Sequence, residues 1–131
     1  MVELVIQSDL DAARAAEDEV LREVERFGFR QEVAFAIRLA LEEAITNAVK
    51  HGNRGDRSKR VRISYHVDND KAEIRVADDG EGFDPAGIPD PTAPSRLALP
   101  NGRGIMLMRA YMDEVSYNGT GNEIRLLKRK G

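Results

Sequence analysis

The 131-residue chain contains no cysteine and no long apolar run. The absence of cysteine excludes disulfides, zinc–thiolate sites and thiol catalysis, and it agrees with a reducing compartment. No stretch approaches the roughly 20 apolar residues that span a bilayer. The first residues also lack the basic start and apolar segment of a signal peptide. We therefore expect a cytoplasmic protein without a membrane anchor.

The sequence also lacks an excess of one charge. Twenty Lys and Arg residues oppose 23 Asp and Glu residues, which gives a net charge of −3. A protein that binds nucleic acid by neutralising phosphates needs a concentrated basic face, and a polybasic membrane contact needs one too. We expect neither kind of partner. With 41% hydrophobic and 33% charged residues, the chain has the composition of one soluble globular domain.

The spacing of apolar residues predicts both kinds of regular structure. Alternation with a period of two predicts strands, and these are expected near residues 2–6, 61–67, 72–78, 115–117 and 124–126. A helical period predicts three helices, over residues 10–27, 31–51 and 105–111. Since the helices are grouped, we expect an α+β fold: a two-layer sandwich of a mainly antiparallel, mixed sheet of about five strands with helices on one face.

Local signals suggest where these elements begin and end. Ser8 with Asp11 resembles a capping pair at the start of the first helix, and Gly28 ends that helix. Gly52 is a plausible residue to follow the second helix. Residues 53–59 are predicted to form a polar loop.

Residues 80–104 stand apart in composition. They contain all five prolines and five of the eleven glycines. An irregular stretch of about twenty residues in a compact domain is commonly a lid or a binding loop. A disordered insertion is the alternative interpretation.

A first group of polar residues lies on the second predicted helix: Glu42, Glu43, Asn47, Lys50 and His51. Residues four apart lie on one helix face, so the 43 and 47 side chains are one turn from each other. An amide oxygen suits Mg²⁺, and a carboxylate nearby could take a proton from an attacking hydroxyl. Taken alone, this group is equally typical of a solvated helix face.

A second group, Asp78 to Gly82 (DDGEG), ends the predicted third strand. Alternation places Asp78 on the face that points toward the helices. An inward carboxylate needs a donor, such as the exocyclic amine of a ligand, and Gly80 and Gly82 allow backbone to approach that ligand. By itself the pattern is also a turn signal.

A third group, Asn101-Gly102-Arg103-Gly104, directly precedes a predicted helix. A glycine-rich approach to a helix N-terminus presents free amides and suits phosphate. Glycine pairs before helices are common, so this signal is weak in isolation.

In this order the three groups resemble the N, G1 and G2 boxes of the GHKL (Bergerat-fold) ATPases. Within that superfamily the segments LALEEAITNAVKHGN, VADDGEGFDP and GRGIMLMRAYMDEVSYN are similar to those of the anti-sigma-factor serine/threonine kinases. The resemblance covers nearly the whole chain. It implies a single histidine-kinase-like ATPase domain over residues 1–131, with an ATP lid at about residues 84–102.

The resemblance also implies a role for each matching residue. Glu43 corresponds to the base that acts on the acceptor hydroxyl, and Asn47 to the Mg²⁺ ligand. The other nucleotide-binding positions implied for ATP or ADP are Lys50, His51, Asp78, Gly80, Gly82, Gly102, Arg103 and Gly104. One departure concerns Asn122, which follows Gly121 where the family often has threonine; this affects a contact near the adenine.

The function implied is an ATP- and Mg²⁺-dependent serine/threonine protein kinase. It would phosphorylate an anti-anti-sigma protein of the STAS type and sequester a sigma factor, and relatives are commonly homodimers. Two alternatives are a nucleotide-gated binding module without kinase activity and a detached histidine-kinase catalytic domain. The latter is disfavoured because the chain has no long helix pair with a phosphoacceptor histidine, and His66 falls on the polar face of a predicted strand.

Overall fold

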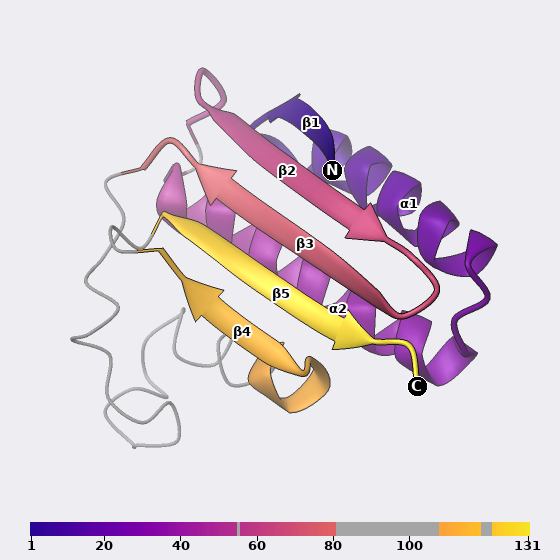
Figure 1. The fold of residues 1–131 in the computed structure, drawn as a ribbon. Helices are drawn as coiled ribbons and strands as arrows, with labels where there is room; N and C mark the ends of the chain where they lie inside the picture. The colour runs from indigo at the N-terminus through magenta and orange to yellow at the C-terminus, as the bar shows by residue number, and fades with distance from the viewer. Residues whose placement is uncertain (55, 81–107, 119–121) are drawn as a thin grey trace.

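The computed structural model describes residues 1–54, 56–80, 108–118 and 122–131, and these form two layers (Figure 1). One layer is a sheet of five strands and the other holds the two long helices. The strands are β1 (Val2–Gln7), β2 (Arg60–Val67), β3 (Lys71–Asp78), β4 (Glu114–Tyr117) and β5 (Glu123–Arg129). The helices are α1 (Leu10–Arg26), α2 (Gln31–Asn47) and the short π-helix η1 (Ala48–Gly52). The α+β sandwich expected from the sequence is confirmed.

The sheet has the strand order β1-β2-β3-β5-β4. Every neighbouring pair in it is antiparallel. The described part of the sheet is therefore wholly antiparallel, whereas the sequence predicts a mainly antiparallel but mixed sheet. β3 and β5 are neighbours although about 45 residues separate them in sequence. This pairing places the end of β3 beside the start of β5, where Ala77 lies opposite Glu123.

The hydrophobic core lies between the sheet and the two helices. Alternate residues of the strands point into it and are buried, as the period of two requires: Val61, Ile63, Tyr65, Ile74, Val76, Ile124 and Leu126. The stripe of Ile37, Leu41 and Ala44 of α2, continued by Ala48 of η1, meets them. The helical and strand periods read from the sequence therefore identified the core correctly.

The ends of α1 differ in one respect from the expectation. Asp9, rather than Ser8, is the N-cap: its side chain accepts a hydrogen bond from the Ala12 amide at 2.8 Å. An N-cap needs extended backbone and a side-chain oxygen free to accept from the first turn, whereas Ser8 is buried and its hydroxyl is used in a contact described below. At the other end Gly28 has a φ of +76°, which explains why glycine ends this helix.

The second helix changes its form at its C-terminal end. α2 stops at Asn47 and continues as the π-helix Ala48–Gly52, and Asn53 is the C-cap. Gly52 is therefore part of the helix and not the residue that follows it. The chain turns away at Arg54, whose φ is +54°. Short π-helical turns often occur at functional sites.

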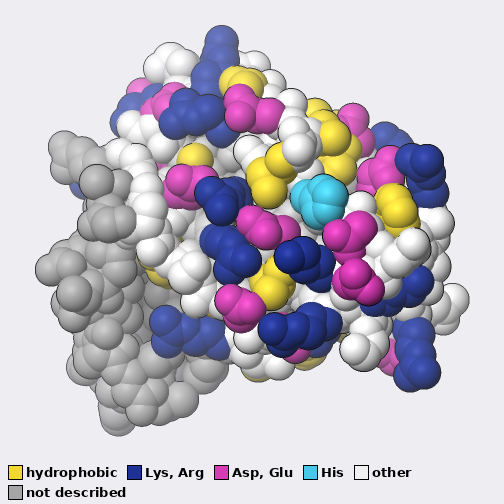
Figure 2. Space-filling model, in the orientation of Figure 1, with side chains coloured by type: hydrophobic (Ala, Val, Ile, Leu, Met, Phe, Trp, Pro, Cys, Tyr) yellow, Lys and Arg dark blue, Asp and Glu magenta, His cyan; other side chains and the backbone are white. Residues whose placement is uncertain are grey.

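The face of the sheet opposite the helices is covered by charged side chains of both signs (Figure 2). Arg62 pairs with Asp79 at 3.1 Å, and Arg125 pairs with both Glu73 and Glu114 at 3.3 Å. No helix within the described ranges is both long and apolar enough to cross a bilayer.

Candidate functional site

The C-terminal turns of α2 bring together the first group of predicted residues. Glu43 is half-buried and Asn47 follows one turn later, as their spacing predicts. The Nδ2 atom of Asn47 is buried, and no acceptor among the described residues bonds to it. Rotating the amide exchanges its nitrogen and oxygen, which are nearly isosteric. This side chain can therefore present an amide oxygen to a cation.

Glu43 also lines a cavity of about 460 Å³. Leu39, Glu42 and Thr46 of the same helix contribute to its wall, and so does Tyr111. Tyr111 belongs to the helical residues 108–111, the described part of the helix predicted over residues 105–111. The Glu43 carboxylate is therefore reachable from outside, while Asn47 lies deeper. Lys50 is exposed; His51 lies in the π-helix, and its side chain is outside the described part.

Asp78 ends β3 at the edge of the layer between sheet and helices. Its Oδ1 atom accepts a hydrogen bond from the Gly80 amide at 2.8 Å, and its own amide donates to the Asn122 carbonyl at 2.9 Å. Burial raises the pKa of Asp78 above its ordinary value, and the Gly80 hydrogen bond opposes this. A half-buried carboxylate is suited to accept a hydrogen bond from a neutral donor on a ligand.

The sheet places Tyr117 of β4 close to the same carboxylate. Burial raises the pKa of Tyr117 to about 12. The negative charge of Asp78 also raises this pKa, whereas the positive charge of Arg109 lowers it. The phenol is therefore neutral at physiological pH. From the sequence Tyr117 is predicted only to lie in a strand. No local pattern shows that this strand pairs with β5, which in turn pairs with β3, the strand that ends at Asp78.

The two groups lie close together because η1 packs against β3. Asn53, which the sequence analysis placed in a polar loop, connects them: it is fully buried, and its Oδ1 atom accepts a hydrogen bond from the Asp79 amide at 2.8 Å. Its position after a glycine in a polar stretch gave no signal of burial.

Several predicted residues lie outside the described part of the chain. These are Gly82, Gly102, Arg103 and Gly104, together with the predicted lid at residues 84–102. Asn122, the noted departure from the family pattern, is described. Its side-chain oxygen accepts a hydrogen bond from the side-chain Nδ2 atom of Asn118 at 2.8 Å, and its backbone carbonyl accepts from the Asp78 amide.

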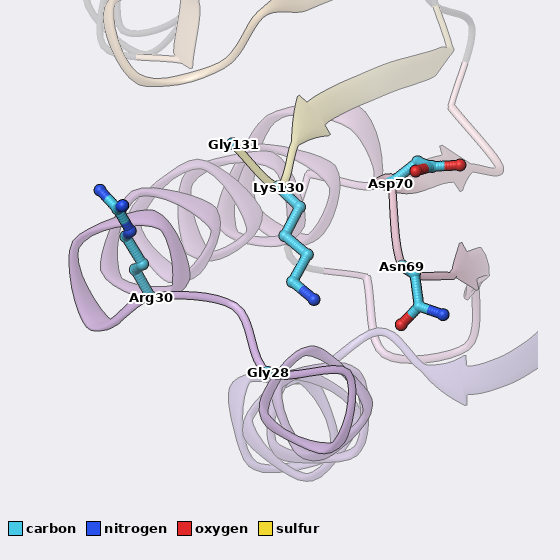
Figure 3. A pocket seen from close by; sticks show the side chains of 6 residues that line it. All are labelled: Gly28, Arg30, Asn69, Asp70, Lys130 and Gly131. Atoms are coloured by element: carbon cyan, nitrogen blue, oxygen red, sulfur yellow. The ribbon is translucent and has the colours of Figure 1, made fainter.

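A second cavity, of about 400 Å³, lies at the other end of the sheet (Figure 3). It is lined by Gly28, Arg30, Asn69, Asp70, Lys130 and Gly131. Arg30 and Lys130 approach it from the start of α2 and the end of β5 (Figure 3). None of the predicted site residues lies there.

The residue types at the first site fit Mg²⁺ held mainly by a nucleotide. Within the described ranges no group of three or more His, Asp or Glu residues could hold a metal by itself. Mg²⁺ commonly keeps several waters and binds one or two protein oxygens together with phosphates, so a single amide such as that of Asn47 suffices.

Comparison with known proteins identifies the family of this chain. Residues 6–128 match the histidine kinase-like ATPase domain. The chain belongs to the histidine kinase-like ATPase family. Membership of this family implies that the chain binds ATP.

Among curated members of this family, the chain is similar to proteins named serine-protein kinase RsbW. It is 33% identical to that of Listeria innocua over 69% of this chain and 61% of that protein. It is 36% identical to the protein of Oceanobacillus iheyensis, over 71% of this chain and 63% of that protein. It is 32% identical to the protein of Bacillus subtilis, over 79% of this chain and 69% of that protein. The matched part of the chain thus spans 61–69% of the length of these relatives.

A solved structure shows the same fold. The crystal structure of the RsbU and RsbW domains of a Mycobacterium tuberculosis protein superposes on 98% of this chain, with a TM-score of 0.60 and 18% identity. The matched region is 32% of that longer chain. At this identity the likeness concerns the fold alone.

Proposed function

We propose that this protein is a serine/threonine protein kinase that transfers the γ-phosphoryl group of ATP to an anti-anti-sigma protein of the STAS type. It would also bind a sigma factor, so that phosphorylation of one partner changes the availability of the other. The observation that carries the proposal is the cavity beside Glu43, because it leaves a carboxylate reachable by a protein hydroxyl one turn from Asn47. The similarity to proteins named serine-protein kinase supports it.

Asp78 would select adenine. Its carboxylate is half-buried, and one oxygen already accepts from Gly80. The other oxygen would accept from the exocyclic amine of the base. A base with a carbonyl at that position would face the carboxylate with an acceptor and would be rejected, since an unpaired buried acceptor is costly.

Asn47 would hold Mg²⁺ through its amide oxygen, and the bound ion would neutralise charge on the phosphates. Glu43 would orient the incoming serine or threonine hydroxyl and accept its proton. The hydroxyl oxygen then forms the new bond to the γ-phosphorus while the bond to the β-phosphate oxygen breaks, which releases ADP. Phosphoryl transfer depends mainly on such positioning and charge neutralisation.

The proposal is tested by separating binding from transfer. We expect Glu43→Gln to keep ATP affinity within about threefold and to lower the transfer rate about a hundredfold or more, as removal of a general base does. Asn47→Ala should weaken Mg²⁺-dependent ATP binding and transfer together. Binding is measured by calorimetry, and transfer by radiolabel from ATP to STAS proteins encoded beside the kinase gene.

The matched control is Glu32→Gln, the same change at an exposed carboxylate in the first turn of α2 that does not line this cavity, which should leave transfer unchanged. If Glu43→Gln transfers at the wild-type rate, Glu43 is not the base. If the wild-type protein binds ATP and its partner but transfers no phosphate, a nucleotide-gated binding module is the better account.

A further inference from the structure

Asn53 is a fully buried polar residue to which no role has been assigned above. It has no exposed surface and follows the π-helix η1, where its backbone amide donates to the Ala48 carbonyl at 2.8 Å. Buried amides are retained where their hydrogen bonds are made. The hydrogen-bond partners of this side chain therefore indicate its role.

The side chain of Asn53 contacts three separate segments. Its Nδ2 atom donates to the Ser8 hydroxyl and to the Arg60 carbonyl, both at 3.0 Å. Its Oδ1 atom accepts from the Asp79 amide at 2.8 Å. One side chain thus joins the end of the α2–η1 helix to the β1–α1 junction, the start of β2 and the end of β3.

Asp79 strengthens the same connection from the other side. Its carboxylate accepts from the Arg60 amide at 2.8 Å and from the Arg62 guanidinium at 3.1 Å. Asn53 holds the Arg60 carbonyl while Asp79 holds the Arg60 amide. The two side chains therefore fix β2 and the end of β3 relative to each other just beyond the last strand pair, Val61 with Asp78.

This arrangement determines the direction of the Asp78 side chain. The amide before its Cα donates to the Asn122 carbonyl at 2.9 Å, and the amide after it, that of Asp79, donates to Asn53. Since a peptide unit is planar, holding the amide on each side fixes both backbone torsions of Asp78. The Cα–Cβ bond of Asp78 then points in one direction before any ligand arrives, and the hydrogen bond from the Gly80 amide to Oδ1 holds the carboxylate at its end.

We propose that Asn53 is a positioning residue of the nucleotide site, which fixes the peptide after Asp78 so that the Asp78 carboxylate is already oriented toward the base in the free protein. This rests on the proposed role of Asp78 in binding ATP. Preorganisation of this kind raises affinity because the ordering cost is met in the folded protein and not at binding.

The first test uses the wild-type protein without nucleotide. The Asp79 amide, although it lies beyond the end of β3, should exchange its hydrogen at least about a hundredfold more slowly than an unprotected amide, measured by NMR. Exchange at the unprotected rate would show that the peptide is not held, and would overturn the proposal whatever the variants do.

The second test compares variants with a matched control. Asn53→Ala removes the acceptor for the Asp79 amide, whereas Ser8→Ala removes a different hydrogen bond of the same buried cluster. Both should lower Tm. Only Asn53→Ala should accelerate exchange of the Asp79 amide and weaken ATP binding, by about tenfold or more, while Ser8→Ala stays within twofold. Calorimetry is run well below both melting temperatures.

Asn53→Asp gives an independent check, because it keeps the oxygen that faces Asp79 but buries a carboxylate. It should be less stable than Asn53→Ala and yet bind ATP more tightly than Asn53→Ala does. If ATP affinity follows Tm across the three variants, the role of Asn53 is only structural. If the wild-type protein binds no ATP, the proposed function fails, while the exchange measurement still reports whether Asn53 holds the Asp79 peptide.

Discussion

Asp78 shows at the residue scale how a binding requirement opposes stability. Burial raises the pKa of its carboxyl, which means that the charged form is less favourable in the folded protein than in the unfolded chain. The Gly80 amide offsets part of this cost. A neutral side chain of the same shape would keep that hydrogen bond and avoid the burial of charge.

We therefore expect Asp78→Asn to have opposite effects on folding and binding. At pH 7 the free energy of unfolding should stay the same or rise, because the penalty of a raised pKa is fully present above the folded-state pKa. The gain should vanish as the pH falls below the ordinary value for aspartate. ATP affinity should fall about tenfold or more, since the amide offers the adenine amine a donor, at a cost of about 1–3 kcal/mol.

Urea unfolding at several pH values and calorimetry with ATP measure the two effects. The control is Asp70→Asn, the same change at an exposed residue immediately before the start of β3. It should alter neither the free energy of unfolding nor the ATP affinity. Unchanged ATP affinity in Asp78→Asn would contradict the assignment of Asp78 to the base.

Some residues of the candidate site could be predicted from the sequence, whereas the burial of Asn53 could not. Glu43, Asn47 and Asp78 follow from spacing along one helix or one strand, and spacing is visible in sequence. The burial of Asn53 depends on Ser8, Arg60 and Asp79. Those partners come from three other segments, so only the tertiary structure shows them.

At the scale of elements, α1 and α2 carry a buried charge at their contact. Glu17 of α1 is only 7% exposed. Burial raises the pKa of Glu17, the negative charge of Glu42 on α2 adds to this, and Arg38 opposes it. The smaller effects of Asp18 and Arg14 on α1 itself have opposite signs. The ionised carboxylate therefore weakens the packing of the two helices.

We expect Glu17→Gln to stabilise the protein at pH 7, on the order of 1 kcal/mol, because a neutral amide replaces a desolvated charge. The penalty is complete above the raised pKa in the folded state and disappears as the pH falls through the ordinary glutamate range. Variant and wild type should therefore converge near pH 3–4. Thermal unfolding across this range is the measurement, and Asp18→Asn, on the same helix, is the control. A constant difference at all pH values would show that charge is not the cause.

The elements themselves were predicted well, and their ends less so. The stripe from Ile37 to Ala48 identified α2, since a long regular period is a strong signal. The π-helical turn that follows has the same types of residue as an α-helix, so the apolar pattern does not distinguish the two forms. The sequence predicts Ser8 as the cap of α1, but the Ser8 hydroxyl accepts a hydrogen bond from Asn53, and Asp9 caps the helix in its place.

At the scale of the whole molecule, ion pairs connect three strands across the open face of the sheet. Glu73 of β3 lies between Arg125 at 3.3 Å and Arg75 at 3.4 Å, and Arg125 continues to Glu114 of β4. Burial alone would raise the pKa of Glu73, but the hydrogen bonds and charges of Arg125 and Arg75 outweigh it and lower that pKa. The carboxylate therefore contributes stability in its charged form.

Glu73→Gln should lower the free energy of unfolding at pH 7 by about 0.5–1 kcal/mol, a size typical of partly exposed pairs. A lowered pKa gives stability above the ordinary pKa that is lost as the pH falls through the folded-state value. The difference from wild type should therefore close in acid, and it should shrink in high salt. Urea unfolding with and without 1 M NaCl tests this. Glu3→Gln, on the exposed edge strand β1, should have little effect.

The register of the strands also decides where the ends of the chain lie. Val2 is opposite Tyr65, toward the far end of β2, and Arg129 is opposite Lys71, at the beginning of β3. Both termini thus lie away from Asp78, Asn47 and Asn53 (Figure 1). A tag, a surface linker or a neighbouring polypeptide attached at either terminus would extend away from the proposed nucleotide site. The domain is thereby suited to be carried as one module of a longer protein, or tethered to a sensor chip, with its site left accessible.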